Sequence, residues 1–170
     1  KSDEDAVYAK EYTFDLSEVV PVAAKPDFVD AVVPAREVCG VHIDEAFPVS
    51  CNNGRIDELR VGAAIVKGRK VAEHVRFLVV PASQEVYRQA MEEGLIQIFM
   101  ESGAIVMNPN CSVCWGSCQG VIGENEVLIS TGTRNFKGRA GHPSSNVYLG
   151  SAATVAASAV KGEICSAEML

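Results

Sequence analysis

This sequence is poor in aromatic residues and in histidine. Aromatic side chains make up 6% of its 170 residues, with a single tryptophan, and three histidines occur. Long apolar runs are also missing, because the most apolar stretch, Val147 to Val160, is interrupted by Gly150, Ser151 and Ser158. A membrane-spanning helix needs about 18 to 20 apolar residues in succession. The sequence therefore predicts no transmembrane segment.

Positive charge is in deficit. Fifteen Lys and Arg residues stand against 22 Asp and Glu, which gives a formal net charge of −7. A chain of this charge is unsuited to coat nucleic acid or an anionic membrane, although a local basic site is compatible with it. Apolar residues at 48% and charged residues at 22% are typical of a globular protein and argue against disordered, collagen-like and coiled-coil chains.

The start of the chain lacks the features of a targeting segment. Residues Lys1 to Tyr8 are rich in charge and contain no apolar centre of the kind that a secretory signal has. They also include no initiator methionine. We therefore expect a fragment or a processed chain that is located in the cytoplasm.

Two regions differ in composition. Residues 1–38 contain three prolines and several acidic residues, with a strand-like run from Tyr12 to Leu16. This composition predicts an extended N-terminal arm or linker over residues 1–38. Residues 39–170 have the alternating pattern of one folded domain, which is where we expect all of the chemistry.

In the folded domain, segments with the helical period alternate with short apolar runs typical of strands. The predicted strands are residues 43–49, 75–80, 104–107, 127–131 and 147–149, and the predicted helices are residues 55–66, 83–93, 95–102 and 151–160. Ser83 and Ser151 are suited to cap the helices that begin with them. This alternation predicts an α/β domain with a mainly parallel sheet, arranged in three layers with helices on both faces.

Three chemically distinctive segments each follow a predicted strand. Cys51 follows the first strand, Cys111 and Cys114 follow the third, and Arg134 and Arg139 follow the fourth. In open α/β sheets, ligands bind outside the carboxyl ends of the strands. We therefore expect these three segments to gather at one edge of the sheet.

Three of the six cysteines, Cys111, Cys114 and Cys118, lie within residues 108–120, which we call the cysteine loop. A Cys-x-x-Cys pair after an Asn-Pro-Asn turn lets two thiolates reach one metal or cluster. Thioredoxin-like redox pairs and zinc sites use the same spacing, and thiols without any ligand are a further alternative. Cys51 lies where a polar turn leads into a helix, whose free N–H groups favour a thiolate. An ordinary capped turn fits the same residues.

The densest basic stretch of the chain is residues 131–139, which we call the arginine loop. It contains Arg134, Lys137 and Arg139. Two guanidinium groups on one short loop are able to converge on a carboxylate through paired hydrogen bonds. The alternative is a solvated basic loop. His142, just beyond it, is expected to be a turn or packing residue rather than a ligand.

Together these motifs resemble those of a known family. The stretches SCNNGR at residues 50–55, NPNCSVC at residues 108–114 and TRNFKGR at residues 133–139 are similar to the aconitase superfamily. The resemblance is closest to the large subunits of 3-isopropylmalate dehydratase and homoaconitase. It runs over nearly the whole chain and implies the C-terminal, third domain of such a subunit. Three motifs in the same order make the resemblance specific.

The resemblance implies a cofactor and its ligands. Cys51, Cys111 and Cys114 match the three cysteines that hold a [4Fe-4S] cluster, whose fourth iron has no protein ligand. In the family, that iron acts as a Lewis acid that helps hydroxide to leave. Arg134 and Arg139 match arginines that bind a substrate carboxylate.

The implied activity is that of a hydro-lyase that isomerises a malate-like hydroxy acid by dehydration and rehydration. Its substrate is expected to be 3-isopropylmalate, as in leucine biosynthesis, or homocitrate and homoaconitate, and the residues do not decide between these acids or citrate. In the family, the catalytic base belongs to a small subunit or a fourth domain that swivels over the site. We therefore assign no catalytic base within the chain and expect it to be inactive alone.

Two positions depart from the family pattern. Thr133 stands where the family has an Asn that contacts the cluster, and Cys118 stands where the isopropylmalate enzymes often have His. Cys118 is then an alternative ligand, a disulfide partner of Cys111 or Cys114, or a core thiol.

Two other functions remain open. One is a zinc-stabilised structural module held by Cys51 and the three cysteines of the cysteine loop. The other is a cluster-switched nucleic-acid binder, which the net charge of −7 disfavours.

Overall fold

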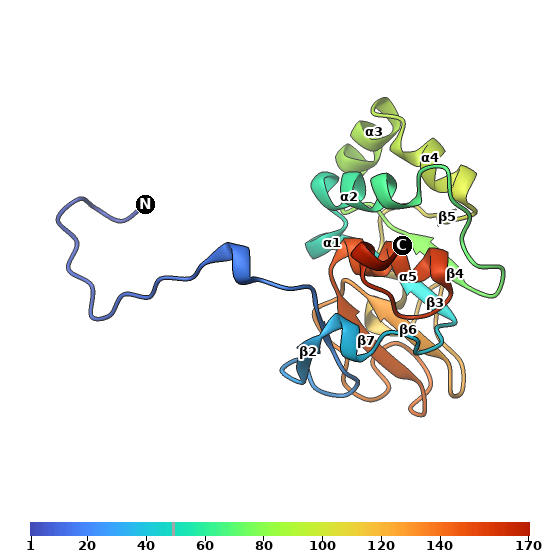
Figure 1. Ribbon diagram of the computed structural model, residues 1–170. Coiled ribbons are helices and arrows are strands. Elements are labelled where there is room, and N and C mark those ends of the chain that lie inside the picture. The colour runs from blue at the N-terminus through green and yellow to red at the C-terminus, as the bar shows by residue number, and fades with distance from the viewer. Residues whose placement is uncertain (49) are drawn as a thin grey trace.

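The computed structural model describes residues 1–48 and 50–170, and its ribbon shows a folded body from which the N-terminal residues extend (Figure 1). The strands are β1 (Val22–Ala24), β2 (Val32–Pro34), β3 (Glu45–Phe47), β4 (Arg76–Val79), β5 (Ile105–Val106), β6 (Val127–Ser130) and β7 (Asn146–Gly150). The helices are α1 (Ser50–Asn53), α2 (Ile56–Val66), α3 (Gln84–Glu92), α4 (Leu95–Ser102) and α5 (Ala152–Lys161). A short 3₁₀ helix, η3 (Ser112–Trp115), lies within the cysteine loop. In the part of the chain that the structure describes, no helix is long and apolar enough to cross a membrane.

The strands form one seven-stranded sheet in the order β2-β1-β7-β6-β3-β4-β5. The five strands from β7 to β5 run parallel to their neighbours, whereas β1 is antiparallel to both β2 and β7. In the centre, Glu45 of β3 is opposite Leu128 of β6 on one side and Arg76 of β4 on the other. The prediction of an α/β domain with a mainly parallel sheet is confirmed.

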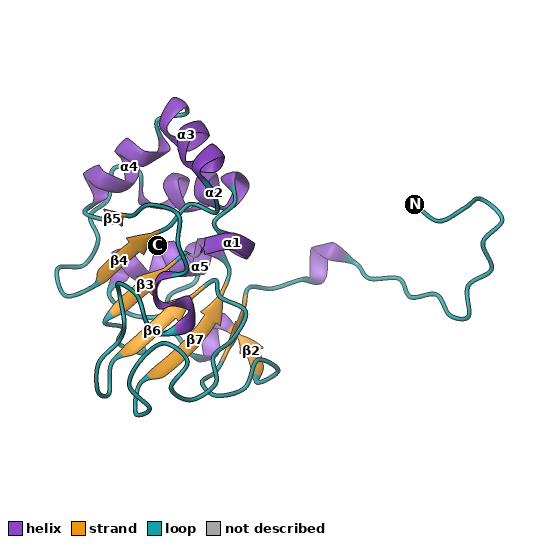
Figure 2. Cartoon of the chain, turned by 180° about the vertical axis from the view of Figure 1, so that it is seen from behind, coloured by secondary structure: helices purple, strands orange, loops and turns teal. Residues whose placement is uncertain are grey.

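Alternate residues along the strands face two different layers. Ala46, Phe77 and Ile129 belong to the larger core cluster, together with apolar side chains of α2, α3, α4 and α5. Phe47 and Leu128 belong to a second cluster on the other face, together with further strand residues and with apolar residues of segments 107–126 and 131–145. Figure 2 shows loops crossing in front of β6 and β7. The domain has three layers, but loops and not helices form the third, because residues 107–126 and 131–145 supply its apolar side chains.

The helix boundaries follow from capping residues. The Ser83 hydroxyl accepts a hydrogen bond from the Val86 N–H at 3.2 Å, and Ser151 does the same for Thr154 at 3.2 Å. Both predicted caps are confirmed. Gly94 and Gly103, with φ of 72° and 98°, adopt the left-handed conformation at the two ends of α4. α4 therefore spans the predicted residues 95–102.

The N-terminal region differs in part from the prediction. The expected strand at Tyr12 to Leu16 is wrong: these residues are exposed, and Leu16–Glu18 form a short 3₁₀ helix. Farther along, β1 and β2 form a hairpin whose first strand extends the sheet beside β7. These two strands lie within the region predicted to be an arm. The division at residue 38 stays a prediction, because strand pairing alone does not establish which residues fold independently.

Candidate functional site

The site is built from segments that leave the sheet at one edge. β3, β5 and β6 are all part of the parallel series, so the residues that follow them emerge on the same side. α1 follows β3, the cysteine loop follows β5, and the arginine loop follows β6. This arrangement is the one expected from the order of motifs in the sequence.

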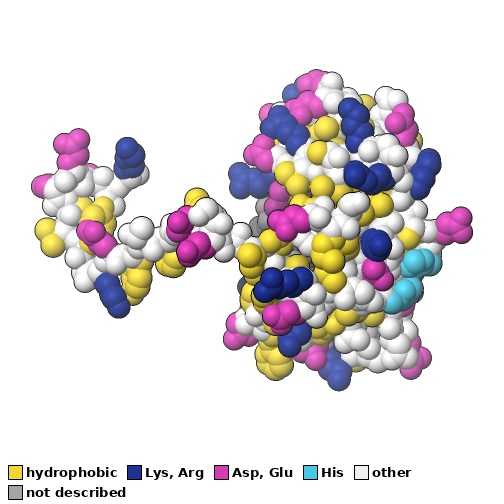
Figure 3. Space-filling view, in the orientation of Figure 1, with side chains coloured by type: hydrophobic (Ala, Val, Ile, Leu, Met, Phe, Trp, Pro, Cys, Tyr) yellow, Lys and Arg dark blue, Asp and Glu magenta, His cyan; other side chains and the backbone are white. Residues whose placement is uncertain are grey.

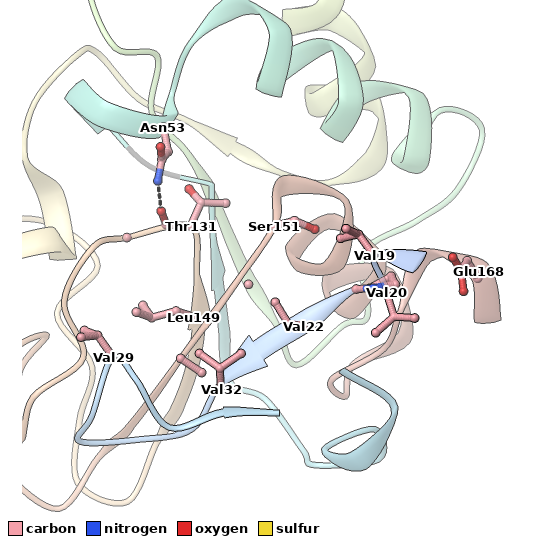
Figure 4. Close-up of a pocket in the computed structure, with 14 residues that line it drawn as sticks. Val19, Val20, Val22, Val29, Val32, Asn53, Thr131, Leu149, Ser151 and Glu168 are labelled. Carbon is pink, nitrogen blue, oxygen red and sulfur yellow. Dashed lines mark hydrogen bonds between the residues drawn. The ribbon is translucent and has the colours of Figure 1, made fainter. Parts of the chain in front are cut away.

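α1 is attached directly to the arginine loop. The side-chain amide of Asn53 donates a hydrogen bond to the Thr131 carbonyl, which Figure 4 draws as a dashed line. The Ala82 N–H, after β4, donates to the Gly54 carbonyl at 2.8 Å. Cys51 belongs to α1, but its side chain lies outside the described residues. Its membership of a ligand set with Cys111 and Cys114 therefore stays a prediction.

The thiols of the cysteine loop differ in their exposure. Ser112 and Val113 are fully buried, whereas Cys111 is exposed and Cys114 is partly exposed. The Cys114 N–H donates to the Cys111 carbonyl at 3.0 Å, which closes the turn between the two cysteines. Cys118 is an exposed free thiol, so its prediction as a core thiol is wrong, and no disulfide joins it to Cys111 or Cys114. Its role as an alternative ligand stays a prediction.

The two predicted arginines share a small cavity with Cys114. Arg134, Arg139 and Cys114 line this cavity together with Phe47 and Gly132, and its volume is about 10 Å³. The Nε atom of Arg139 is buried there without a hydrogen-bond partner among the described residues, and its guanidinium carbon lies 5.5 Å from the centre of the Phe136 ring. A buried donor without a partner favours the binding of an acceptor such as a carboxylate.

Asn135 is a site residue that the sequence did not indicate. Its side chain is 1% exposed, and its Nδ2 donates to the Lys25 carbonyl at 2.7 Å and to the Phe28 carbonyl at 3.3 Å. The Asp27 N–H returns a hydrogen bond to the Asn135 carbonyl at 3.1 Å. These bonds fix the arginine loop to the β1–β2 hairpin. An isolated Asn in a polar loop gives no sequence pattern that would foretell this distant contact.

Glu45 is a second residue that the sequence did not single out as part of the site. Its side chain is fully buried, and its Oε2 accepts a hydrogen bond from Arg76 Nε at 3.0 Å. Arg76 also binds both carboxylate oxygens of Glu126, at 2.9 and 2.6 Å. Burial raises the pKa of Glu45 to about 7, although the Arg76 guanidinium opposes the increase.

The donor atoms of the site fit a metal cluster better than a hard cation. Two thiols, at Cys111 and Cys114, lie at the two ends of one turn, the first exposed and the second partly exposed, and thiolates are the ligands that iron–sulfur clusters and zinc prefer. Among the side chains that the structure describes, which do not include that of Cys51, no three of His, Cys, Asp or Glu converge on one metal position. A third thiolate from Cys51 would complete the set. His142, whose Nδ1 lies 2.8 Å from Ser144 Oγ, is the turn residue that was predicted.

A larger apolar pocket lies beside the small cavity. Its volume is about 610 Å³, and Val19, Val29, Val32 and Leu149 are among its lining residues (Figure 4). Gly132 lines both spaces. On the face of the molecule in Figure 3, Lys and Arg are interspersed with Asp and Glu rather than gathered into one basic surface.

Comparison with known proteins relates the chain to one family. The model of the aconitase family (aconitate hydratase) matches residues 34–162. The "3-isopropylmalate dehydratase large subunit 2" of Archaeoglobus fulgidus is 52% identical over 164 residues, which are 96% of this chain and 39% of the relative. The "Probable methanogen homoaconitase large subunit" of Methanothermobacter thermautotrophicus is 50% identical over 163 residues, which are 96% of this chain and 38% of the relative. The chain thus spans about two fifths of the length of these relatives.

Proposed function

Because this chain belongs to the aconitase family, we propose that it is the third, cluster-carrying domain of a hydro-lyase large subunit. The relatives that it matches are named as large subunits of 3-isopropylmalate dehydratase and of homoaconitase. The proposed reaction is the isomerisation of a malate-like hydroxy acid, 3-isopropylmalate or homocitrate and homoaconitate, by dehydration and rehydration. Such a reaction belongs to cytoplasmic amino-acid biosynthesis.

The proposed cofactor is a [4Fe-4S] cluster held by Cys51, Cys111 and Cys114. When bound, it would supply an iron without a protein ligand, which acts as a Lewis acid on the hydroxyl group that leaves. The closeness of Cys111 and Cys114 on one turn, the first exposed and the second partly exposed, supports this assignment. Cys114 would then hold the cofactor and also line the cavity of the two arginines.

Arg134 and Arg139 are proposed to hold the substrate carboxylate. The single observation that carries this proposal is that both arginines line one cavity with Cys114, which is itself a proposed cluster ligand. The partnerless Nε of Arg139 is the group that would donate to the carboxylate. Arg134 Nη1 is already bonded to the Thr133 carbonyl at 2.7 Å, which orients its side chain.

The chain is proposed to act with a partner. No catalytic base is assigned within it, and the relatives' names as large subunits support a small subunit as the source of the base. Because the chain also covers only two fifths of their length, the remaining groups of the site would come from the rest of a large subunit. We expect the 170 residues alone to bind a cluster but to turn over no substrate.

The test is anaerobic reconstitution of the purified chain with iron and sulfide. We expect a brown protein with absorbance at about 400 nm, and no turnover of 3-isopropylmalate or homoaconitate by this protein alone. The Archaeoglobus fulgidus large subunit, assayed with its small subunit, is the positive control. Turnover by the isolated chain would contradict the division of labour proposed here.

A zinc-stabilised module is the second candidate function, because Cys118 is a free, exposed thiol in the same loop. Four thiolates would close the coordination sphere of zinc. Cys118→Ser separates the two assignments, since it removes the fourth zinc ligand and leaves the three proposed cluster ligands. Zinc at one equivalent that is lost in Cys118→Ser would favour the structural module. Cluster absorbance that is unchanged in Cys118→Ser would favour the hydro-lyase domain.

A further inference from the structure

A buried carboxylate lies beneath the cysteine loop with half of its hydrogen-bonding capacity unused. Glu45 is fully buried on β3, and its Oε2 is paired with Arg76. Its other oxygen, Oε1, is buried without a hydrogen-bond partner in the described part of the chain. An unpaired buried acceptor is costly, and more so when it carries charge. The arrangement therefore favours a donor that reaches Oε1.

Oε1 faces the cysteine loop at Gly120. A β-carbon placed on Gly120 would lie 3.4 Å from Glu45 Oε1 and 3.6 Å from Ser112 Oγ, so both oxygens border the same point. The same β-carbon would lie 2.2 Å from Leu78 Cδ1, and Gly120 has a φ of +82°. A glycine is thus required for the loop to approach the sheet this closely.

The hydroxyl group of Ser112 is the hydrogen-bond donor that borders this point. Ser112 lies between the two cysteines, is fully buried and points toward the sheet, whereas Cys111 is exposed. Its hydroxyl donates to the Gln119 carbonyl at 2.6 Å. A hydroxyl has one proton to donate. Gln119 and Glu45 therefore offer two alternative acceptors for the same proton.

We propose that Glu45 is a positioning residue for the cysteine loop, and that its Oε1 accepts the Ser112 hydroxyl in a second arrangement of that loop. In this arrangement the segment between Cys111 and Cys114 is anchored to β3 by a hydrogen bond to the Glu45 carboxyl group. Arg76 and Glu126 are the charged groups that face Glu45, from β4 and from the residue before β6. The consequence for a bound cluster rests on the proposed function, but the anchoring of the loop does not.

The test compares two variants in the metal-free chain. Glu45→Gln and Glu126→Gln each remove one carboxylate from Arg76, but only Glu45 faces the loop. In Glu45→Gln, we expect Arg76 to hold the amide oxygen, so that the NH₂ group faces Ser112, where it is able to donate to the hydroxyl oxygen but not to accept the hydroxyl proton. We expect alkylation of Cys111, followed by mass spectrometry, to be about tenfold faster in Glu45→Gln and unchanged in Glu126→Gln. Equal rates in the two variants would overturn the proposal.

Ser112→Ala provides a second test that leaves the ion pairs intact. We expect it to accelerate alkylation as Glu45→Gln does, and the double variant to be no faster than either single variant. Independent, multiplicative effects would show that the two residues do not act as a pair and would overturn the proposal. If Glu45→Gln does not fold, an unchanged alkylation rate in Ser112→Ala overturns it. Because no metal is present, a chain that passes both tests but takes up no iron contradicts the proposed function and not this inference.

Discussion

Glu45 links the stability of the protein to pH. Burial raises its pKa from 4.5 to about 7, so between these values the folded chain keeps a proton that the unfolded chain releases. The free energy of unfolding should therefore fall as pH rises through this window, by about 3 kcal/mol for this residue. Denaturant titrations at both ends of the window would measure the fall. Glu45→Gln should lack this part of the pH dependence, and parallel curves for the two proteins would contradict the prediction.

A substitution of Arg139 separates the effect of the planar guanidinium geometry from that of the positive charge. Arg139→Lys in the assembled enzyme keeps the positive charge but loses the planar fork that matches a carboxylate. We expect kcat/KM to fall by the equivalent of about 2 to 3 kcal/mol, which is typical of a lost charge-assisted hydrogen bond. Lys137→Gln is the control, since this exposed residue is on the same loop but does not line the cavity. A similar loss in both variants would indicate a general effect of loop charge.

At this scale the sequence predicts residues whose chemistry is unusual in itself. Cys111, Cys114 and Arg139 stand out by type and spacing, and Ser83 and Ser151 stand out as helix caps. Glu45 does not, because an isolated Glu in a sequence is expected to be exposed. Its burial depends on Arg76 and Glu126, which are remote in the sequence and meet it only when β3, β4 and β6 are aligned.

Among the elements, the arginine loop depends on the β1–β2 hairpin. Asn135→Ala would remove two hydrogen bonds to the hairpin and leave the Lys25 and Phe28 carbonyls without this partner. We expect the free energy of unfolding to fall by about 1 to 3 kcal/mol. Asn146→Ala, at an exposed position on β7, is the matched control and should change stability by less than about 0.5 kcal/mol. Equal losses in the two variants would mean that the hairpin contact does not contribute to the free energy of unfolding.

Long elements with a clear period were predictable, and short ones were not. α2 and α4 follow from apolar spacing, and α3 and α5 follow also from the caps Ser83 and Ser151. β1 and β2 have three residues each and contain alanine or proline, which have little preference for strands. They form because β1 pairs with β7, which is a contact between distant segments. α1 was likewise expected to be a turn, since four residues are too few to show a period.

On the scale of the whole molecule, the first residues contribute nothing to the core. None of residues 1–20 is buried, whereas Ala23 and Ala24 of β1 are. Deletion of residues 1–15 should therefore shift the Tm by less than about 2 °C. Deletion of residues 1–24 is the comparison, because it removes β1 and should lower the Tm clearly. Calorimetry would measure the Tm of the full chain and of both deletions. An equal decrease of the Tm in the two deletions would contradict the prediction.

The sequence also predicted the class of the domain and the edge of the sheet at which the reactive loops meet. It did not predict the loop layer. A strand buried on both faces requires a cover, and helices are the usual one. Here apolar residues such as Val113, Ile122 and Ala140 supply that cover from irregular segments, which have no period for a sequence to display.

The order of the strands has a consequence for synthesis on the ribosome. β3, β4 and β5 are complete once Val106 has been made, but the neighbour of β3 on its other side is β6, which begins at Val127. Until then one edge of β3 has free N–H and C=O groups, which are able to pair with another nascent chain. β1 lacks its partner strand β7 until Asn146–Gly150 have been made. Contacts this distant in sequence form slowly, so chains released before residue 127 should aggregate, whereas the finished chain closes the sheet from its C-terminal third.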